Sequence, residues 1–323
     1  MKLVTWDKEG IPTLGALAED RVVDLPVAYA AFLEDRGSGP LEMFPEEMNA
    51  FLEAGDAALD AAKAAISFAE GRLELSRPLD LSEGQKGETR LRPPVPAPRK
   101  LFCLATNYQE HMEERGTYRM QKKDTVTPRI FMKPPSTTLR AHGEPILISP
   151  QAQWIDWEGE LAIVIGKRGK YIPRDEAMGY VAGYSCLNDV SERALKIRDR
   201  VETDARDAYF DWLNGKWMDS FAPMGPVLVT ADEISDPHDL ELSLWVNGKR
   251  MQHASTGGMI FDIPDMLEYL SCYITLEPGD VIATGTPSGV GRAQGIRLEP
   301  GDVVRLEIEG IGVLENPVEA EEV

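Results

Sequence analysis

Short stretches in which apolar and polar side chains alternate predict strands at the start of the chain. Residues 2–6 and 21–25 have this pattern, and the glycines and prolines between them mark turns, so we expect a small antiparallel sheet. Residues 55–66 are rich in alanine and repeat apolar side chains at helical spacing. This segment therefore predicts a helix.

A proline-rich segment divides the chain. Residues 82–99 contain four prolines and two glycines, which exclude a regular helix or a central strand and predict an extended linker. We therefore expect a small N-terminal α/β domain at residues 1–92, a linker at 93–99 and a second domain at 100–323.

The second domain shows many short strands and few helices. Residues 240–246 alternate and end at Asn247 and Gly248, which is a hairpin signal because both residues tolerate positive φ. A helix is predicted to begin near Pro264, since proline suits a first helical turn. The expected fold class is α+β, mainly β.

One five-residue sequence, Leu-Glu-Pro-Gly-Asp, occurs twice, at residues 276–280 and 298–302. Each copy precedes β-branched residues, and we interpret both as Pro-Gly turns that enter strands. Two copies are too few for a repeat architecture.

One predicted strand carries two acids. Residues 155–165 place apolar side chains at most odd positions, while Glu158 and Glu160 project from the other side about 7 Å apart. These like charges are tolerable on a solvated face, or in a cavity where a divalent cation offsets their repulsion. A third acid, Asp189, follows the aromatic and apolar segment 183–187 and could join them, although an Asn-Asp pair more commonly forms a turn or caps a helix.

Composition narrows the class of protein. The 323 residues include 34 Lys and Arg against 54 Asp and Glu, and the net charge of −20 excludes nucleic acid and anionic membranes as partners. The apolar runs fall far below the roughly 18 residues of a membrane span, and the first residues lack the apolar region of a signal peptide, so we expect a cytoplasmic protein. Cys103, Cys186 and Cys272 lie far apart, and we expect all three to be buried thiols.

Eight segments between about Lys100 and Val318 resemble the fumarylacetoacetate hydrolase family. Any one of them would be a weak signal, but eight in consistent order are highly specific. They are Asn107-Tyr108 with His111 and Glu114, Phe131–Ser136, Asp156–Leu161, Asn188–Ser191, Gly215-Lys216, Phe221–Pro226, Val246–Gly248 and Gly285–Gly289.

The resemblance implies a fold, a bound metal ion and a catalytic base. The family's mixed β-roll surrounds a metal-centred cavity, usually in a homodimer, and the substrate is a small diketo or 2-oxo acid. Glu158, Glu160 and Asp189 are then the ligands of Mg²⁺ or Mn²⁺. His111 is the implied catalytic base with Glu114 as its partner, and their spacing of three puts both on one face of a helical turn.

Four further residues match family positions that contact substrate. Lys216 would hold substrate oxygens, and Thr286 would contact substrate from a glycine-rich turn that lacks the Gly-Lys-Ser/Thr ending of a phosphate-binding loop. Arg193 and Gln252 are weaker candidates for binding a substrate carboxylate. Each of these residues also has a plainer interpretation as a solvated polar side chain.

Two departures from the family pattern concern the cavity. Ala194 stands where many relatives have aspartate, and it begins an insertion over residues 194–212 that we expect to alter the cavity rim. Residues 104–106 lack a glycine that relatives often have before Asn107, so we expect the hinge of the family's lid to differ.

The implied reaction is metal-dependent hydrolysis of a carbon–carbon bond in an acylpyruvate-like or diketo acid. The main alternative is a lyase on the same metal site: an oxaloacetate-type decarboxylase, a hydroxymuconate isomerase/decarboxylase or a dehydratase of a 3-deoxy-2-oxo sugar acid. A non-catalytic metabolite-binding protein is the third interpretation, because a fold alone does not guarantee a function.

Overall fold

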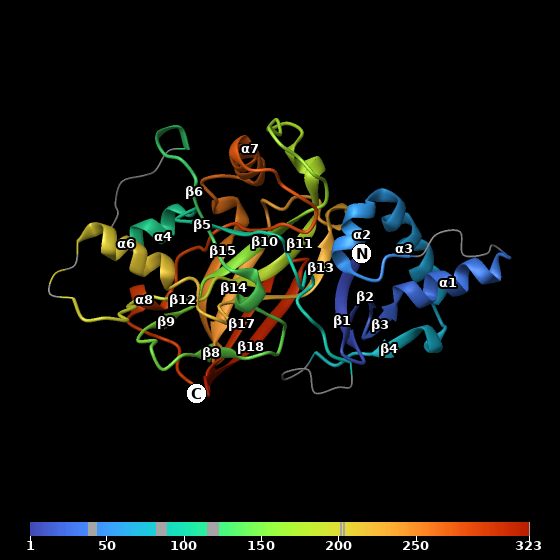
Figure 1. Ribbon diagram of the computed structural model, residues 1–323, viewed down its shortest axis with the longest axis horizontal. Coiled ribbons are helices and arrows are strands. Elements are labelled where there is room, and N and C mark those ends of the chain that lie inside the picture. Colours follow the sequence, from blue (N-terminus) through green and yellow to red (C-terminus); the bar gives the residue numbers. More distant parts are fainter. Residues whose placement is uncertain (38–43, 82–88, 115–122, 201, 203, 323) are drawn as a thin grey trace.

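The computed structural model describes residues 1–37, 44–81, 89–114, 123–200, 202 and 204–322 (Figure 1). Within these residues a large mixed sheet of eleven strands packs against a second sheet of five, and helices cover the outer surfaces. The fold is α+β and mainly β, as the sequence predicts.

The N-terminal strands form the expected antiparallel sheet, and α3 confirms the helix predicted over residues 55–66. The methyl groups of Ala58, Ala62, Ala65 and Ala69 form the buried face of α3, which lets the helix lie close to its neighbours. The elements of this region are β1 (Lys2–Lys8), β2 (Ile11–Ala18), β3 (Arg21–Asp24), β4 (Ser76–Pro78), α1 (Leu25–Asp35), α2 (Met48–Ala54) and α3 (Asp56–Ala69).

The N-terminal strands are continuous with the rest of the large sheet, because β1 pairs with β13 (Ala222–Thr230). The strand order is β4-β3-β2-β1-β13-β11-β10-β16-β5-β6, with β7 beside β13. The remaining members are β5 (Leu101–Ala105), β6 (Arg129–Met132), β7 (Leu139–Arg140), β10 (Gly159–Ile165), β11 (Val181–Asn188) and β16 (Val281–Ala283). The boundary between the two expected domains stays a prediction.

The expected linker at 93–99 is not uniformly extended, because the backbone bends at residues 94–97 and 99, and part of it is packed against the sheet. The amide of Arg92 donates to the Thr5 carbonyl at 2.8 Å, and the Thr5 hydroxyl donates to the Pro94 carbonyl at 2.8 Å. Val95 is fully buried. Residues 82–88 of the proline- and glycine-rich segment lie outside the described residues.

The second sheet has the order β15-β14-β17-β18-β8 and confirms the predicted hairpin. Asn247 and Gly248 join β14 to β15 with φ of 51° and 76°. The strands are β8 (Ile146–Ile148), β14 (Glu241–Val246), β15 (Lys249–Ser255), β17 (Val303–Ile308) and β18 (Gly312–Ala320).

Strand β10 separates two hydrophobic cores, because its side chains alternate between the faces of the large sheet. Leu161 and Ile163 pack toward the second sheet, whereas Ala162 and Val164 pack in the core beneath helices α1–α3. Both faces of β10 are therefore buried, and polar side chains on it require partners inside the protein.

The remaining helices are short and surround one end of the β-structure (Figure 1). The predicted helix near Pro264 is confirmed as α7, which begins after the capping residue Asp262. The helices are α4 (Gln109–Glu114), α5 (Pro135–Thr138), α6 (Ala205–Asn214), α7 (Ile263–Tyr273) and α8 (Gly291–Gln294), with 3₁₀ turns at Leu73–Leu75, Lys123–Thr125, Ala177–Tyr180, Ala231–Glu233 and Thr256–Gly258. Within the described residues no helix has the length and apolar character to cross a membrane.

Both Leu-Glu-Pro-Gly-Asp segments form the predicted turns. Gly279 and Gly301 have φ of 83° and 98°, and each is followed by an aspartate whose Oδ2 accepts from the glutamate amide three residues earlier at 2.8 Å. The first turn leads into β16 and the second into β17.

Two predictions were wrong in detail. The strand predicted over 155–165 is broken: β9 (Ile155–Asp156) pairs with β12 (Ser191–Glu192), and the main strand resumes at Gly159. Cys272 is exposed near the end of α7 rather than buried, whereas Cys103 and Cys186 are buried as expected.

Candidate metal centre

The break between β9 and β10 is fixed by a buried aspartate. Asp156 Oδ1 accepts from the amides of Trp157 and Gly291 at 2.9 and 2.6 Å, and Oδ2 accepts from the amide of Arg292 at 3.1 Å. These bonds are stronger than those of a regular ladder because the acceptor is charged. They turn the backbone at Trp157 and lead into Glu158.

The segment after the break is tied to the end of β11. The amide of Glu158 donates to Asn188 Oδ1, and the amide of Asp189 donates to the Glu158 carbonyl, both at 2.9 Å. Glu160 follows two residues later on β10, which pairs with β11. The side chains of Glu158, Glu160 and Asp189 therefore come from two adjacent strand ends.

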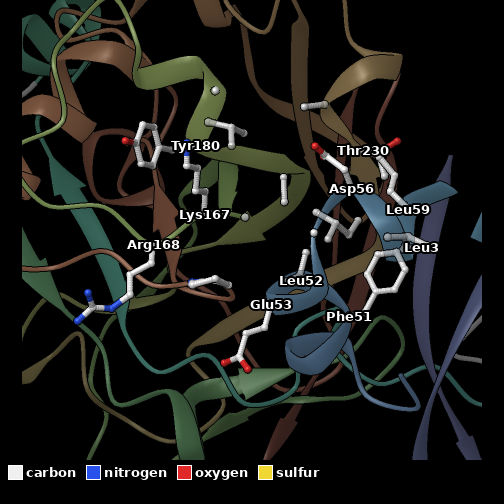
Figure 2. Close-up of a pocket in the computed structure, with 18 of the residues that line it drawn as sticks. Leu3, Phe51, Leu52, Glu53, Asp56, Leu59, Lys167, Arg168, Tyr180 and Thr230 are labelled. Atoms are coloured by element: carbon white, nitrogen blue, oxygen red, sulfur yellow. The ribbon is translucent and has the colours of Figure 1, made fainter. Parts of the chain in front are cut away.

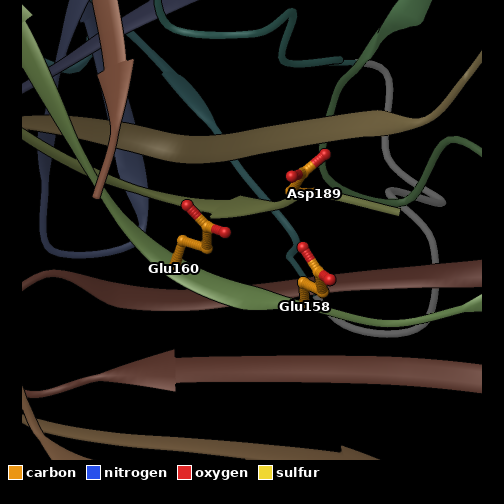
Figure 3. Close-up of side chains that lie close together, drawn as sticks. All are labelled: Glu158, Glu160 and Asp189. Carbon is orange, nitrogen blue, oxygen red and sulfur yellow. The ribbon is translucent and has the colours of Figure 1, made fainter. Parts of the chain in front are cut away.

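The three acids converge inside the protein (Figure 3). Glu158 is 6% exposed, Glu160 0% and Asp189 1%, and one carboxylate oxygen from each lies within 4.8 Å of the other two. The solvated-face interpretation of the strand is therefore wrong, because all three acids are buried; that they hold a cation stays a prediction. Asp189 caps no described helix.

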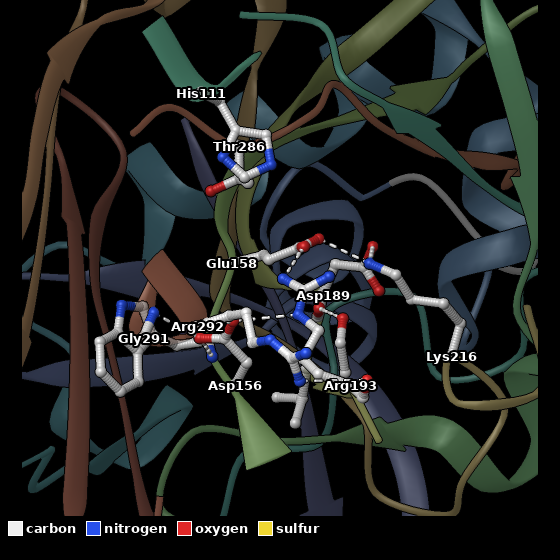
Figure 4. Close-up of polar contacts among 12 residues, drawn as sticks. His111, Asp156, Glu158, Asp189, Arg193, Lys216, Thr286, Gly291 and Arg292 are labelled. Atoms are coloured by element: carbon white, nitrogen blue, oxygen red, sulfur yellow. Dashed lines mark hydrogen bonds and ion pairs between the residues drawn. The ribbon is translucent and has the colours of Figure 1, made fainter. Parts of the chain in front are cut away.

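Three buried or nearly buried cations contact the acids of the site: Lys133, Arg193 and Lys216, of which Figure 4 shows Arg193 and Lys216. Lys216 Nζ donates to Glu158 Oε2 and Asp189 Oδ2, each at 2.6 Å, while Lys133 donates to Asp189 Oδ1. Arg193 donates to Glu158 and, at 3.0 Å, to Asp156. Lys133 and Asp156 had no predicted role, although both lie in segments that carry the family resemblance.

One ligand atom of the cluster is left without a partner. Glu160 Oε2 accepts from the amide of Gly285 at 2.7 Å, but the buried Oε1 has no hydrogen-bond partner among the residues that the structure describes. Burial raises the pKa of Glu160 well above its usual range, and the charges of Asp189 and Glu158 raise it further. Burial also opposes ionisation of Glu158, yet Arg193 and Lys216 hold the pKa of Glu158 below its usual range.

The residues present fit a hard divalent cation. Glu158, Glu160, Asp189 and Asp156 supply four carboxylates against the three cations Lys133, Arg193 and Lys216, which leaves one negative charge when all are ionised. One carboxylate oxygen of Glu160 lies within 4.8 Å of an oxygen of each of the other two acids, and carboxylate oxygens are the ligands that Mg²⁺ and Mn²⁺ prefer.

His111 and Glu114 lie together on α4, as their spacing predicts. His111 Nδ1 is 4.0 Å from Glu114 Oε2, and that oxygen accepts from the amide of Gly289 at 2.7 Å. Burial raises the pKa of Glu114, although the amides of Gly289 and Val290 oppose the rise. The glycine-rich turn thus holds the carboxylate beside the imidazole.

Three of the four predicted catalytic side chains, those of His111, Lys216 and Thr286, line one small cavity of about 10 Å³, whereas Glu114 does not. Its lining residues are Leu104, Ala105, Thr106, His111, Glu158, Arg193, Trp212, Lys216 and Thr286. A cavity of this size holds roughly one water molecule. The structure therefore brings His111, Lys216, Arg193 and Thr286 to the acid cluster.

Gln252 does not line this small cavity but bonds to the backbone and side chains beside it. Its Oε1 accepts from the amide of Gly159, and its Nε2 donates to Thr286 Oγ1 and to the Pro287 carbonyl, all at 2.8–2.9 Å. The Thr286 hydroxyl in turn donates to the Gly159 carbonyl at 3.0 Å. Gln252 is 1% exposed and joins the glycine-rich turn to β10 between the two glutamates. Direct contact of Gln252 with substrate stays a prediction.

Both departures from the family pattern lie in the cavity wall. The insertion over 194–212 contains most of α6, and Trp212 on that helix lines the cavity. The Trp212 ring packs edge-on against Phe131 with 5.2 Å between centroids. Residues 104–106 also line this cavity. The expectation that the insertion alters the cavity rim relative to other family members stays a prediction.

A larger cavity of about 830 Å³ lies elsewhere, between α2 and the ends of β10 and β11 (Figure 2). Apolar side chains such as Phe51 and Leu52 line it on one side, and Lys167, Arg168 and Tyr180 line it on the other. None of the candidate site residues contributes to its wall.

Comparisons with known proteins agree with the geometry. The family model for the fumarylacetoacetate hydrolase C-terminal region matches residues 100–319, which is about two thirds of the chain. The chain belongs to the fumarylacetoacetate hydrolase family. The match covers every residue of the acid cluster and its cations, so family membership and the site rest on the same part of the chain.

Relatives in this family differ in the reaction that their names state. Oxaloacetate tautomerase FAHD2A, a mitochondrial protein of Homo sapiens, is 38% identical over 276 residues, covering 85% of this chain and 80% of the relative. Maleylpyruvate hydrolase of Sphingobium sp. SYK-6, solved with manganese(II) and pyruvate, has a TM-score of 0.72 and 27% identity over all of both chains. A 5-carboxymethyl-2-hydroxymuconate delta-isomerase of Mycobacterium smegmatis has a TM-score of 0.68 and 29% identity, covering 99% of this chain and 100% of that one.

Proposed function

We propose that the protein is a divalent-metal-dependent hydrolase that cleaves the carbon–carbon bond of an acylpyruvate-like diketo acid. The observation that carries the proposal is the convergence of Glu158, Glu160 and Asp189 beside His111. A bound Mg²⁺ or Mn²⁺ would act as a Lewis acid for the negative charge that develops on the oxygens of the leaving enolate. The manganese and pyruvate bound to the maleylpyruvate hydrolase support this choice of ligands.

The protein's own groups supply the proton transfer and the positioning. His111 takes the proton of the attacking water, and Glu114 stabilises the imidazolium that forms. Lys216 lies between two of the acids and places an ammonium group next to the substrate oxygens. Gln252 holds Thr286 and the glycine-rich turn against β10, so it acts as a positioning residue.

A substrate panel tests the proposal. We expect the Mg²⁺-loaded protein to convert acetylpyruvate (2,4-dioxopentanoate) to pyruvate and acetate, and a chelator to abolish this activity. Acylpyruvates, oxaloacetate and a 3-deoxy-2-oxo sugar acid should be assayed in parallel. No metal-dependent turnover of any acylpyruvate would contradict the hydrolase proposal.

A second candidate is conversion of the enol and keto forms of oxaloacetate. The mitochondrial relatives named oxaloacetate tautomerase favour it, because they match 85% of this chain at 37–38% identity. This reaction uses the same enolate but needs no attacking water, and His111 would move a proton to or from carbon. Nuclear magnetic resonance separates the alternatives: tautomerisation forms no new product, decarboxylation forms pyruvate and CO₂, and hydrolysis forms two acids.

Three further properties stay proposals. We infer a small 2-oxo or diketo acid as the partner molecule, since the cavities at the acid cluster are small. The homodimer and the cytoplasmic location are expectations from the resemblance and the sequence. Size-exclusion chromatography with light scattering and cell fractionation are the respective measurements.

A further inference from the structure

A second cavity, of about 300 Å³, adjoins the acid cluster on the side of α4 and α8. It is lined by His111, Glu114, Arg193, Val290, Arg292 and Ala293. Two of these residues, His111 and Arg193, also line the inner cavity, so the two spaces share a wall. Because the inner cavity holds only about 10 Å³, most of any bound substrate must lie in the outer one.

The two arginines of this outer cavity differ in their partners. The guanidinium of Arg193 is engaged by Glu158 and Asp156 and has little capacity for a further anion. Among the described residues no carboxylate pairs with the guanidinium of Arg292, which donates only to the carbonyl of Arg193 at 3.5 Å. Arg292 is therefore the cation of this cavity that remains available to a ligand.

The position of Arg292 is fixed by the catalytic framework (Figure 4). Its amide donates to Asp156 Oδ2, the same carboxylate oxygen that accepts from Arg193 Nε. Its guanidinium lies over the ring of Trp154, 5.5 Å from the centroid, which restrains the side chain by a cation–π contact. A planar guanidinium held in this way suits two-point recognition of a carboxylate.

We propose that Arg292 determines substrate specificity by binding a carboxylate at the end of the substrate that is remote from the acid cluster. The preferred substrates are then dicarboxylic 2-oxo acids rather than acylpyruvates with an uncharged end. The inference rests on the proposed function, because it assumes that the 2-oxo acid end of the substrate lies at the acid cluster.

Binding of two probes of equal length tests the inference without turnover. 2-Oxoglutarate and 2-oxopentanoate share the 2-oxo acid end and differ only in a terminal carboxylate or methyl group. Titration calorimetry with the Mg²⁺-loaded protein should show tighter binding of 2-oxoglutarate. In Arg292→Gln this preference should fall by about tenfold or more, the loss expected for one charge-assisted hydrogen bond, while the affinity for 2-oxopentanoate should stay within about twofold.

Two variants control for charge and folding. Arg297→Gln removes an arginine of the same region that contacts Gln153 and Glu299 and does not line the cavity, and it should retain the preference. Arg292→Lys should retain part of it, because the charge remains but the two-point geometry is lost. Melting temperatures confirm that each variant is folded.

The outcomes separate this inference from the proposed function. Equal binding of both probes by the wild type, or an unchanged preference in Arg292→Gln, would overturn the role of Arg292 and leave the metal centre intact. Failure of both probes to bind the metal-loaded protein would overturn the inference together with the proposed function.

Discussion

Two fully buried carboxylates, Glu160 and Asp280, differ instructively in their surroundings. Each is 0% exposed, each has one oxygen without a hydrogen-bond partner, and burial raises the pKa of both. The other oxygen of Asp280 accepts from Lys100 Nζ at 2.9 Å and from the amide of Glu277 at 2.8 Å. Asp280 is thus a turn residue paired with a cation, Lys100, which it shares with Glu277.

Within the described part of the chain no cation forms an ion pair with Glu160, since the lysines and the arginine of its cluster are bound to Glu158, Asp189 and Asp156. Burial and an unpartnered oxygen are therefore not enough to indicate a metal site. The distinguishing feature is convergence: three carboxylates point at one place, and together with Asp156 they supply four negative charges against three neighbouring cations when all are ionised.

The largest expected effect distinguishes these two regions directly. Asp189→Asn removes a charge from the converging set, so kcat/KM for the best substrate should fall at least about 10³-fold, because a Lewis acid supplies several kcal/mol of transition-state stabilisation. Mg²⁺ affinity by calorimetry should fall as well. Asp280→Asn is the matched control and should leave both quantities near the wild-type values. Similar losses of kcat/KM and Mg²⁺ affinity in Asp189→Asn and Asp280→Asn would contradict the difference between the converging acids and Asp280.

The next effect separates proton transfer from metal binding within the site. His111→Ala should lower hydrolysis by about 10² to 10⁴-fold, the usual contribution of a general base. Mg²⁺ affinity should not change, because His111 is not among the converging acids. Decarboxylation, which needs no attacking water, should be spared. Equal loss of hydrolysis and decarboxylation would contradict the role of His111 as the base for water.

The pH dependence of Mg²⁺ affinity tests whether Glu160, and not Asp280, must ionise for the metal to bind. The raised pKa means that the folded, metal-free protein favours the protonated form of Glu160. Its contribution to stability is therefore fully present below the usual pKa of a glutamate. That contribution is lost as the pH rises through the raised pKa. Metal binding needs the ionised form, so Mg²⁺ affinity should rise with pH, by up to about tenfold per pH unit, with release of a proton. Calorimetry in buffers of different ionisation enthalpy measures this release.

Two variants indicate which group releases the proton. Glu160→Gln should abolish the proton release together with much of the affinity, whereas Asp280→Asn should retain both. A Mg²⁺ affinity that is independent of pH in the wild type would contradict the assignment of the proton to Glu160.

The smallest effect concerns stability and uses the repeated turn. Asp280→Ala removes the bonds to Lys100 and to the Glu277 amide, and the free energy of unfolding should fall by about 1 to 3 kcal/mol. Asp302→Ala changes the same position of the second copy, which is partly exposed, and should cost less than about 1 kcal/mol. Chemical denaturation measures the free energy of unfolding of both variants. A larger decrease in Asp302→Ala than in Asp280→Ala would mean that burial of the aspartate does not determine the cost of removing it.

The sequence predicted those elements whose hydrogen bonds join residues close together in the chain. Both Leu-Glu-Pro-Gly-Asp turns, the hairpin at Asn247 and the helix near Pro264 could be predicted because their deciding hydrogen bonds lie within a few residues. Glu158 and Glu160 drew attention through the alternation of a predicted strand, although the strand is broken and Glu158 precedes β10. Their assignment with Asp189 as metal ligands came from the family resemblance.

Long-range partners could not be predicted from the sequence alone. Lys133 binds Asp189 across 56 positions, and Asp156 breaks its strand by accepting from the amide of Gly291, 135 positions away. Contacts between residues so far apart in the sequence produce no periodic pattern from which they could be predicted. Cys272 was predicted to be buried because free cysteines usually are, but it lies on the outer side of α7.

The pairing of β1 with β13 determines how the chain can be dissected. Residues 1–92 supply β1, which pairs with the end of β13 (Lys2 with Val229, Leu3 with Leu228), so a fragment starting at Lys100 would expose the backbone groups of that part of β13 at an open sheet edge. Such a fragment would tend to recruit a foreign strand and precipitate. The proline-rich segment is consequently a poor place to cut, and the catalytic part is best studied with its N-terminal strands attached.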